Sequence, residues 1–176
     1  MALIKDRKHT ADLWKLLEAG AEGEATFDKL GTESAQDVIV PLSVWRAQRE
    51  ALLARSGRLG VWLAGEHDPG EIAQDLAHFQ VIAVHFKTFN DGRGYSTGQL
   101  LRRRYGWQGE LRAIGEVRRD HLMYLVRCGF DAFALPDDED LEVALTAFGD
   151  FSESYQASID QPLPLFRRRE TARQGA

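Results

Sequence analysis

Five short apolar runs, each followed by a segment with helical character, are the feature that most constrains the fold of this chain. The runs cover residues 37–42, 59–64, 79–86, 111–117 and 131–135. Short apolar runs in alternation with helical segments are typical of βαβ units. Such units build a mostly parallel sheet covered by helices. We therefore predict an α/β fold with a sheet of about five strands.

The intervening segments set the expected helices and narrow the architecture. Helices are expected from Ser43 to about Gly57, and over residues 71–76, 95–105, 120–128 and 139–158. Pro41 favours the end of the first strand, and Gly129 suits the position just after the fourth helix. Right-handed crossovers leave an open sheet or a partial β/α barrel, since five strands are too few for a closed eight-stranded barrel.

The sequence predicts one domain with a segment before it and a tail after it. A length of 176 residues fits a single domain with its own core. Within residues 1–34 we expect an edge strand over 2–9, a weak helical patch over 12–17 and a loop over 20–34. Residues 35–160 form the α/β domain. Residues 161–176, which hold two prolines and an arginine run, are expected to be a disordered tail.

Composition excludes several classes of protein. A net charge of −5 argues against nucleic-acid binding. No apolar run reaches the roughly 20 residues that span a bilayer, and residues 1–10 lack the apolar core of a signal peptide. The lone Cys128 excludes a disulfide framework and a cysteine-rich metal site. The five histidines show no metal-ligand spacing. We expect a cytoplasmic protein without a metal.

Charge is unevenly distributed along the sequence. Residues 91–134 carry eight arginines against five acids, whereas residues 135–160 carry eight acids and no basic side chain. One interpretation is a pair of solvated helix faces. The other is an anion site in the basic stretch and a docking face for a basic partner in the acidic one.

Polar side chains that follow the strands mark the candidate site, because ligands of α/β proteins gather beyond the carboxyl ends of the strands. The glycine-rich loop 90–98 follows the third strand and opens a helix, so its amides and Arg93 suit an oxyanion. The alternative is a tight turn in which Ser96 or Thr97 caps the helix. The candidate anion-binding residues are Lys87, Asp91, Gly92, Arg93, Gly94, Ser96, Arg112 and Arg118.

Two carboxylates near the end of the fourth strand are candidates for acid–base catalysis. Glu116 ends the strand, where burial would raise its pKa and arginine neighbours would lower it. An ion pair of Glu116 with Arg112, Arg118 or Arg93 is the structural alternative. Asp120 can act in catalysis or as the N-cap of the next helix.

The segments 86–102, 105–120 and 127–133 together are similar to a known bacterial family. They contain the loop Asn-Asp-Gly-Arg-Gly-Tyr-Ser-Thr-Gly and the strand Gly-Glu-Leu-Arg-Ala-Ile-Gly-Glu. The chain resembles the DUF934 family over about residues 37–150, most specifically between 86 and 135. Glu116 and His121 depart from the Asp and Gln expected there. Family members are commonly encoded beside sulfite reductase and labelled as oxidoreductases, so the resemblance implies a role in assimilatory sulfate or sulfite reduction.

Two functional hypotheses follow. In the first, the protein is a non-catalytic accessory of sulfite reduction that docks on sulfite reductase or another sulfur-assimilation protein through residues 137–158. In the second, it is a small α/β enzyme, an oxidoreductase or one acting on a phospho- or sulfo-ligand. Arg93 and Arg118 would then bind the anion, while Glu116 or Asp120 would move protons. No cofactor is identifiable, because the sequence lacks a flavin or nicotinamide fingerprint and one cysteine cannot run a dithiol cycle. We favour the accessory role; the oligomeric state stays open, with a homodimer among the alternatives.

Overall fold

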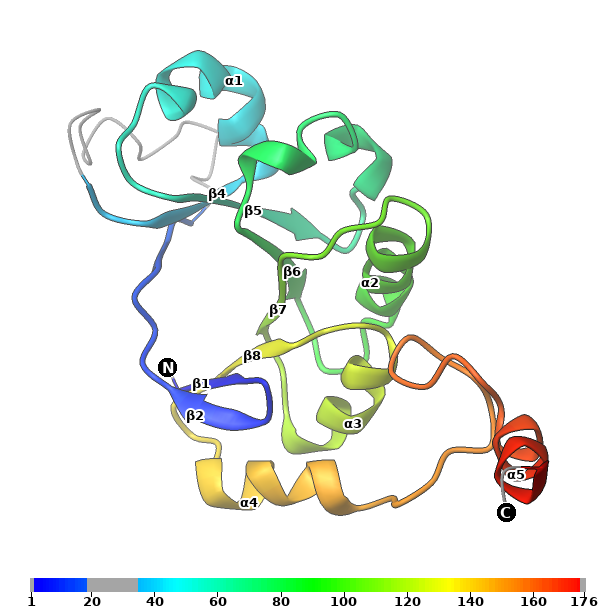
Figure 1. The fold of residues 1–176 in the computed structure, drawn as a ribbon. Helices are drawn as coiled ribbons and strands as arrows, with labels where there is room; N and C mark the ends of the chain where they lie inside the picture. The colour runs from blue at the N-terminus through cyan, green and yellow to red at the C-terminus, as the bar shows by residue number, and fades with distance from the viewer. Residues whose placement is uncertain (1, 19–34, 175–176) are drawn as a thin grey trace.

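One curled sheet organises the fold (Figure 1). The computed structural model describes residues 2–18 and 35–174. Within them the sheet has eight strands in the order β2-β1-β8-β7-β6-β5-β4-β3. The strands are β1 (Ala2–Lys5), β2 (Lys8–Thr10), β3 (Lys15–Leu16), β4 (Val38–Pro41), β5 (Leu59–Ala64), β6 (Val81–Phe86), β7 (Glu110–Gly115) and β8 (Ala132–Leu135).

The topology is singly wound. Strands β3 to β8 are parallel, and each pairs with the next in the chain. Strand β1 pairs antiparallel with β8, and β2 with β1 through a tight turn in which Asp6 and Arg7 both have positive φ. The structure confirms an α/β fold with an open sheet. The expected strand number was wrong, because the described residues 2–18 contribute three short strands rather than one.

The described helices are α1 (Leu42–Leu53), α2 (Arg93–Arg103), α3 (Arg119–Arg127), α4 (Leu141–Thr146) and α5 (Leu165–Gln174), with 3₁₀ turns η2 (Pro69–Ile72), η3 (Leu76–His78) and η4 (Ala147–Gly149). Helices α1, α2 and α3 lie along one face of the sheet (Figure 1). Gly129 follows α3 with φ +98°, as predicted for that position. Because parallel neighbours follow in chain order, the crossovers between β4 and β8 return on the same face.

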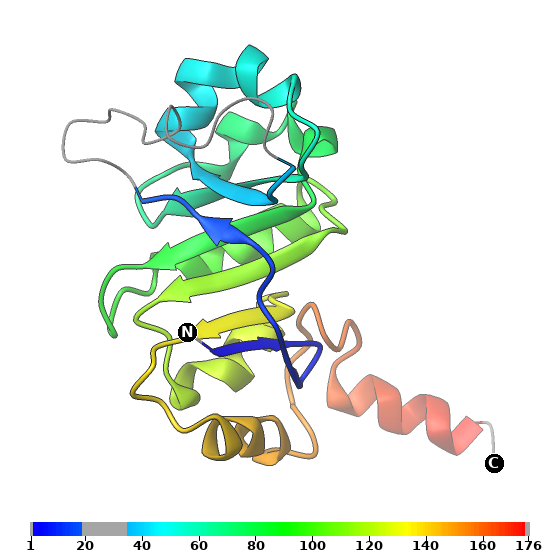
Figure 2. The same cartoon turned by 90° about the vertical axis from the view of Figure 1, so that its left-hand side faces the viewer.

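The secondary structure of three segments differs from the prediction. The helix predicted over 139–158 is only α4 and η4, since Gly149 and the Ser- and Asp-rich stretch after it are poor helix formers. Residues 69–78 form 3₁₀ turns, and the tail expected to be disordered contains α5. That helix projects away from the sheet (Figure 2).

The N-terminal segment crosses the inner face of the sheet, which the helices leave uncovered (Figure 2). Residues 12–17, predicted as a weak helical patch, are extended instead. The amides of Lys15 and Leu17 donate to the carbonyls of Asp37 and Ile39 along β4. Trp14 and Leu16 alternate toward small apolar side chains on this face, which include Ala83. The apolar residues of this segment therefore follow the period of two of a strand and not the spacing of a helix.

Candidate functional site

The carboxyl ends of β6 and β7 bring most of the predicted site residues to one edge of the sheet. After β6 come Lys87, Asp91 and Arg93; after β7 come Glu116 and Arg118. Arg112 was wrongly placed in this set. It lies near the start of β7, at the opposite end of the strand, and is buried. An inward-pointing position close to the amino end of a parallel strand cannot reach the edge where the strand ends.

In the glycine-rich loop, the chain supplies its own anion. Helix α2 begins at Arg93, where the Asp91 carboxylate accepts the backbone amide of Arg93 at 3.3 Å. The Arg93 guanidinium donates to both oxygens of Asp91, at 2.9 and 2.8 Å, and lies 3.7 Å from Glu66. This pairing lowers the pKa of Asp91 to about 2. The guanidinium expected to bind an external oxyanion is thus already paired with carboxylates of the protein itself.

Two glycines of this loop allow α2 to pack closely against the core. Gly94 and Gly98 are buried within α2 and face aromatic rings of the core. A Cβ on Gly94 would lie 2.6 Å from Cζ of Phe86, and one on Gly98 would clash with the ring of Phe130. Ser96 is exposed within the first turns of the helix, so it is not the N-cap, which is Gly92. The glycine spacing therefore lets α2 approach the sheet closely.

A second cluster joins the basic and acidic segments. Arg118 donates to Asp138 at 2.8 Å and to Glu139 at 3.2 Å. These contacts raise the pKa of Arg118 and lower the pKa of Asp138. Arg119 pairs with Asp150 at 2.8 Å. The charge imbalance seen along the sequence is thus partly cancelled within the molecule, which weakens the case for a docking face that attracts a basic partner.

The two proposed catalytic carboxylates lie in water. Glu116 lies 3.6 Å from Arg118, with half of its side chain exposed. Asp120 is 76% exposed and lies 3.7 Å from Arg119. Asp120 is not the N-cap of α3, since that helix begins at Arg119. Neither carboxylate is buried, and burial is the usual environment of a carboxylate that acts as a general acid or base.

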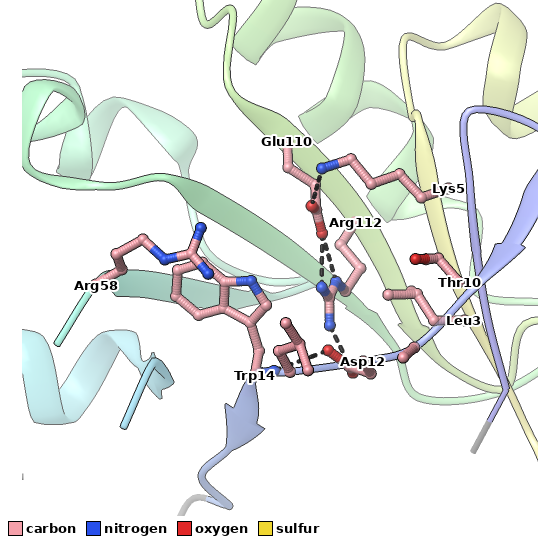
Figure 3. Close-up of a pocket in the computed structure, with 10 residues that line it drawn as sticks. Leu3, Lys5, Thr10, Asp12, Trp14, Arg58, Glu110 and Arg112 are labelled. Atoms are coloured by element: carbon pink, nitrogen blue, oxygen red, sulfur yellow. Dashed lines mark hydrogen bonds and ion pairs between the residues drawn. The ribbon is translucent and has the colours of Figure 1, made fainter. Parts of the chain in front are cut away.

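Arg112 forms a different site, a buried ion cluster beneath the N-terminal segment (Figure 3). Its Nε and Nη2 both approach Oε1 of Glu110 at 2.7 Å, and Nη1 donates to Asp12 at 2.8 Å. Lys5 donates to the other oxygen of Glu110 at 2.8 Å. These groups border a small cavity of about 160 Å³. The cluster ties the crossing segment to β7, and the helical interpretation of residues 12–17 concealed it.

Sequence reasoning also missed a cavity on the inner face. His85, near the end of β6, is not among the site residues predicted from the sequence. It points inward and packs against Trp62, with ring centroids 5.6 Å apart. The cavity beside these rings measures about 440 Å³. The signal available in the sequence was the alternation along β6, which places Val81, Ala83 and His85 on one face.

The described part of the chain shows no metal centre and no membrane span. No three His, Cys, Asp or Glu side chains in it are grouped to hold an ion. None of its helices is long and apolar enough to cross a bilayer. Cys128 is buried, and burial raises the pKa of its thiol, which disfavours the thiolate that redox chemistry requires.

The strand order and the parallel pairing define an α/β protein with a singly wound, open sheet. A family model described as a bacterial protein of unknown function, DUF934, matches residues 60–166. The chain belongs to this family. Neither the curated proteins nor the solved structures contain a match to it.

Proposed function

We propose that this protein is an accessory of assimilatory sulfate or sulfite reduction, and that it acts by binding a partner protein through its C-terminal extension. The extension comprises residues 150–174. The pathway rests on the resemblance to a family encoded beside sulfite reductase, so sulfite reductase is the first partner to test. The binding role rests on the surface of the extension.

One observation carries the proposal: large apolar side chains in the extension face water. Phe151, Tyr155, Leu163 and Phe166 are 66%, 69%, 53% and 48% exposed. They lie within 16 residues of one another in the sequence, in the segment that leads into α5 and in α5 itself, and this helix projects from the rest of the molecule (Figure 2). Grouped apolar side chains of this kind mark protein interaction sites.

Contacts within the extension give it a defined surface. Arg168 donates to Glu153 at 2.5 Å and to the carbonyl of Ser154 at 2.8 Å, and the amide of Leu165 donates to the carbonyl of Tyr155. These contacts fix α5 against the preceding segment, beside a hollow of about 260 Å³. Its described lining combines aliphatic and aromatic side chains with two arginines and one glutamate: Tyr155, Leu165, Phe166, Arg169, Glu170 and Arg173. A partner surface that fits would be apolar with an acidic rim.

The enzymatic alternative at Arg93 and Glu116 has weaker support. Arg93 is paired with Asp91 and Glu66, and Glu116 is exposed beside Arg118. A reaction centre at that edge would need these ion pairs to open. No second function is therefore proposed from these residues.

The test is a binding measurement between the full chain and the sulfite reductase of the same bacterium. We expect the double variant Phe151→Ser with Phe166→Ser to weaken binding at least tenfold, because two aromatic anchors commonly dominate such an interface. The matched control is Leu13→Ser with Phe89→Ser, which removes side chains that are 68% and 57% exposed elsewhere. It should bind as the wild type does.

Two outcomes contradict the proposal. One is the absence of binding by the wild-type protein at micromolar concentrations. The other is concentration-dependent dimerisation that the Phe151→Ser and Phe166→Ser pair abolishes, which would assign the surface to self-association.

A further inference from the structure

The inner-face cavity lies on the face of the sheet near the carboxyl ends of the strands, which are the ends at which parallel α/β sheets bind ligands. Its floor is built by side chains at the ends of three neighbouring strands: Trp62 on β5, His85 on β6 and Ile114 on β7. Leu16 and Leu17 of the crossing segment form a further wall. A volume of about 440 Å³ falls in the range of small-molecule sites.

The two ring side chains in the cavity are held in different ways. The indole of Trp62 donates to the carbonyl of Leu17 at 2.8 Å, which fixes the ring against the crossing segment. The imidazole of His85 packs on that indole and has no hydrogen-bond partner among the residues that the structure describes. Burial lowers the pKa of His85, so at neutral pH the uncharged ring offers one donor and one acceptor.

Gly115 leaves the space beside the imidazole open. It ends β7 with φ +91°, and a Cβ there would lie 3.0 Å from Nε2 of His85. Any side chain at this position would therefore press on the ring and narrow the cavity. The glycine keeps one edge of His85 accessible.

The charged side chains around the cavity restrict the charge that its ligand can carry. Among the residues that the structure describes, Glu18 is the one charged side chain in the lining, and no lysine or arginine belongs to it. Beyond the lining, Glu66, Asp91 and Lys87 act on His85 through space. Arg93, which lies near two of these acids, is already paired with Asp91. The described lining therefore offers an anionic ligand no cation.

We propose that this cavity binds a planar aromatic or heteroaromatic small molecule that carries no anionic group, with its face against Trp62 and a polar edge hydrogen-bonded to His85. Stacked or edge-on rings are favourable arrangements beside an indole. The aliphatic wall of Leu16, Leu17 and Ile114 accommodates the rest of the ring system. This inference is independent of partner docking at the C-terminal extension.

Three probes with one ring system and different charges test the proposal: indole, tryptamine and indole-3-acetate. Each is titrated into the full chain at pH 7.5, while the histidine ring signals are followed by NMR. We expect indole and tryptamine to shift the His85 signal. We expect both to bind roughly threefold to tenfold more tightly than indole-3-acetate, because a carboxylate would lie near Glu18 without a counter-charge.

Matched histidine variants locate the site. His85→Leu should weaken indole binding roughly twofold to tenfold, which corresponds to one lost hydrogen bond. His9→Leu, at an exposed position on β2, should leave binding unchanged. The proposal is overturned if no probe shifts the His85 signal at millimolar concentration. It is also overturned if indole-3-acetate binds most tightly. Because the titration of the wild type decides both points, the result does not depend on the folding of a variant.

Discussion

The carboxylate of Asp91 holds the guanidinium of Arg93 through two hydrogen bonds of 2.9 and 2.8 Å, although only one residue separates them in sequence. The same carboxylate accepts the first backbone amide of α2. It thus compensates both the helix dipole and the arginine charge. The glycine-rich loop, whose sequence suggests the binding of an external anion, instead begins α2 with a carboxylate of its own.

This pairing makes a pH-dependent contribution to stability. The pKa of Asp91 in the folded state is lowered from 3.8 to about 2, so the ionised carboxylate stabilises the fold. The contribution is complete above about pH 4 and is lost as the pH falls from there through 2. In urea unfolding from pH 5 to 2, the stability advantage of the wild type over Asp91→Asn should shrink as the pH falls. A constant difference between the two proteins would contradict this assignment.

The glycines of the same loop give a prediction with an internal control. Gly94→Ala and Gly98→Ala should each destabilise the protein by about 1–3 kcal/mol, because the added methyl group presses on buried rings. Gly92→Ala should stay within about 0.5 kcal/mol of the wild type, since its Cβ would meet nothing closer than 4.0 Å. Chemical denaturation measures all three. An equal loss at all three positions would show that the loop, not helix packing, sets the requirement for glycine.

The sequence predicted the central part of the fold well and the site less well. Runs of β-branched and aliphatic residues fix strands such as β6 whatever surrounds them, because only a buried strand suits them. Glycine has two physical uses, however: it frees the backbone, and it permits close approach. Choosing between them for Gly94 and Gly98 requires knowledge of Phe86 and Phe130, which lie on other elements.

Long-range pairing explains the other differences. Asp12 is the first residue of the predicted weak helical patch, yet it pairs with Arg112 a hundred residues later. Likewise, the acidic stretch does not reveal that Asp138 and Asp150 pair with arginines of the preceding segment. Local patterns contain no information on such partners, so surface charge inferred from composition alone was overestimated.

The buried ion cluster should be important for stability. Replacing Arg112 by Met would leave Glu110, which is 7% exposed, with Lys5 as its remaining cationic partner. We expect a loss of about 3–5 kcal/mol in the free energy of unfolding. Arg167→Met, at a 63% exposed position that pairs with Glu170, should cost less than about 0.5 kcal/mol. A comparably small effect at Arg112 would indicate that the N-terminal segment is not anchored by the cluster.

Adjacent arginines on α2 should behave in opposite ways. Arg102 donates to the carbonyls of Gly129, Trp107 and Gly109 and to the carboxylate of Asp131. Arg102→Met should therefore destabilise the protein by about 2–4 kcal/mol, because several buried acceptors lose their donor. Arg103→Met, at an exposed neighbouring position, is expected to change stability by less than about 0.5 kcal/mol. Thermal or urea unfolding distinguishes the two, and similar losses would refute the specific role of Arg102.

Cys128 gives a test of the redox interpretation attached to the family. Its thiol is buried near Nε2 of Gln99, and burial raises its pKa. A thiol reagent at pH 8 should therefore label the native protein about 100-fold more slowly than the urea-unfolded chain, because reaction requires local opening. Rapid stoichiometric labelling of the folded protein would show an accessible thiolate. Slow labelling would mean that any redox function of this protein must use chemistry other than that of its own cysteine.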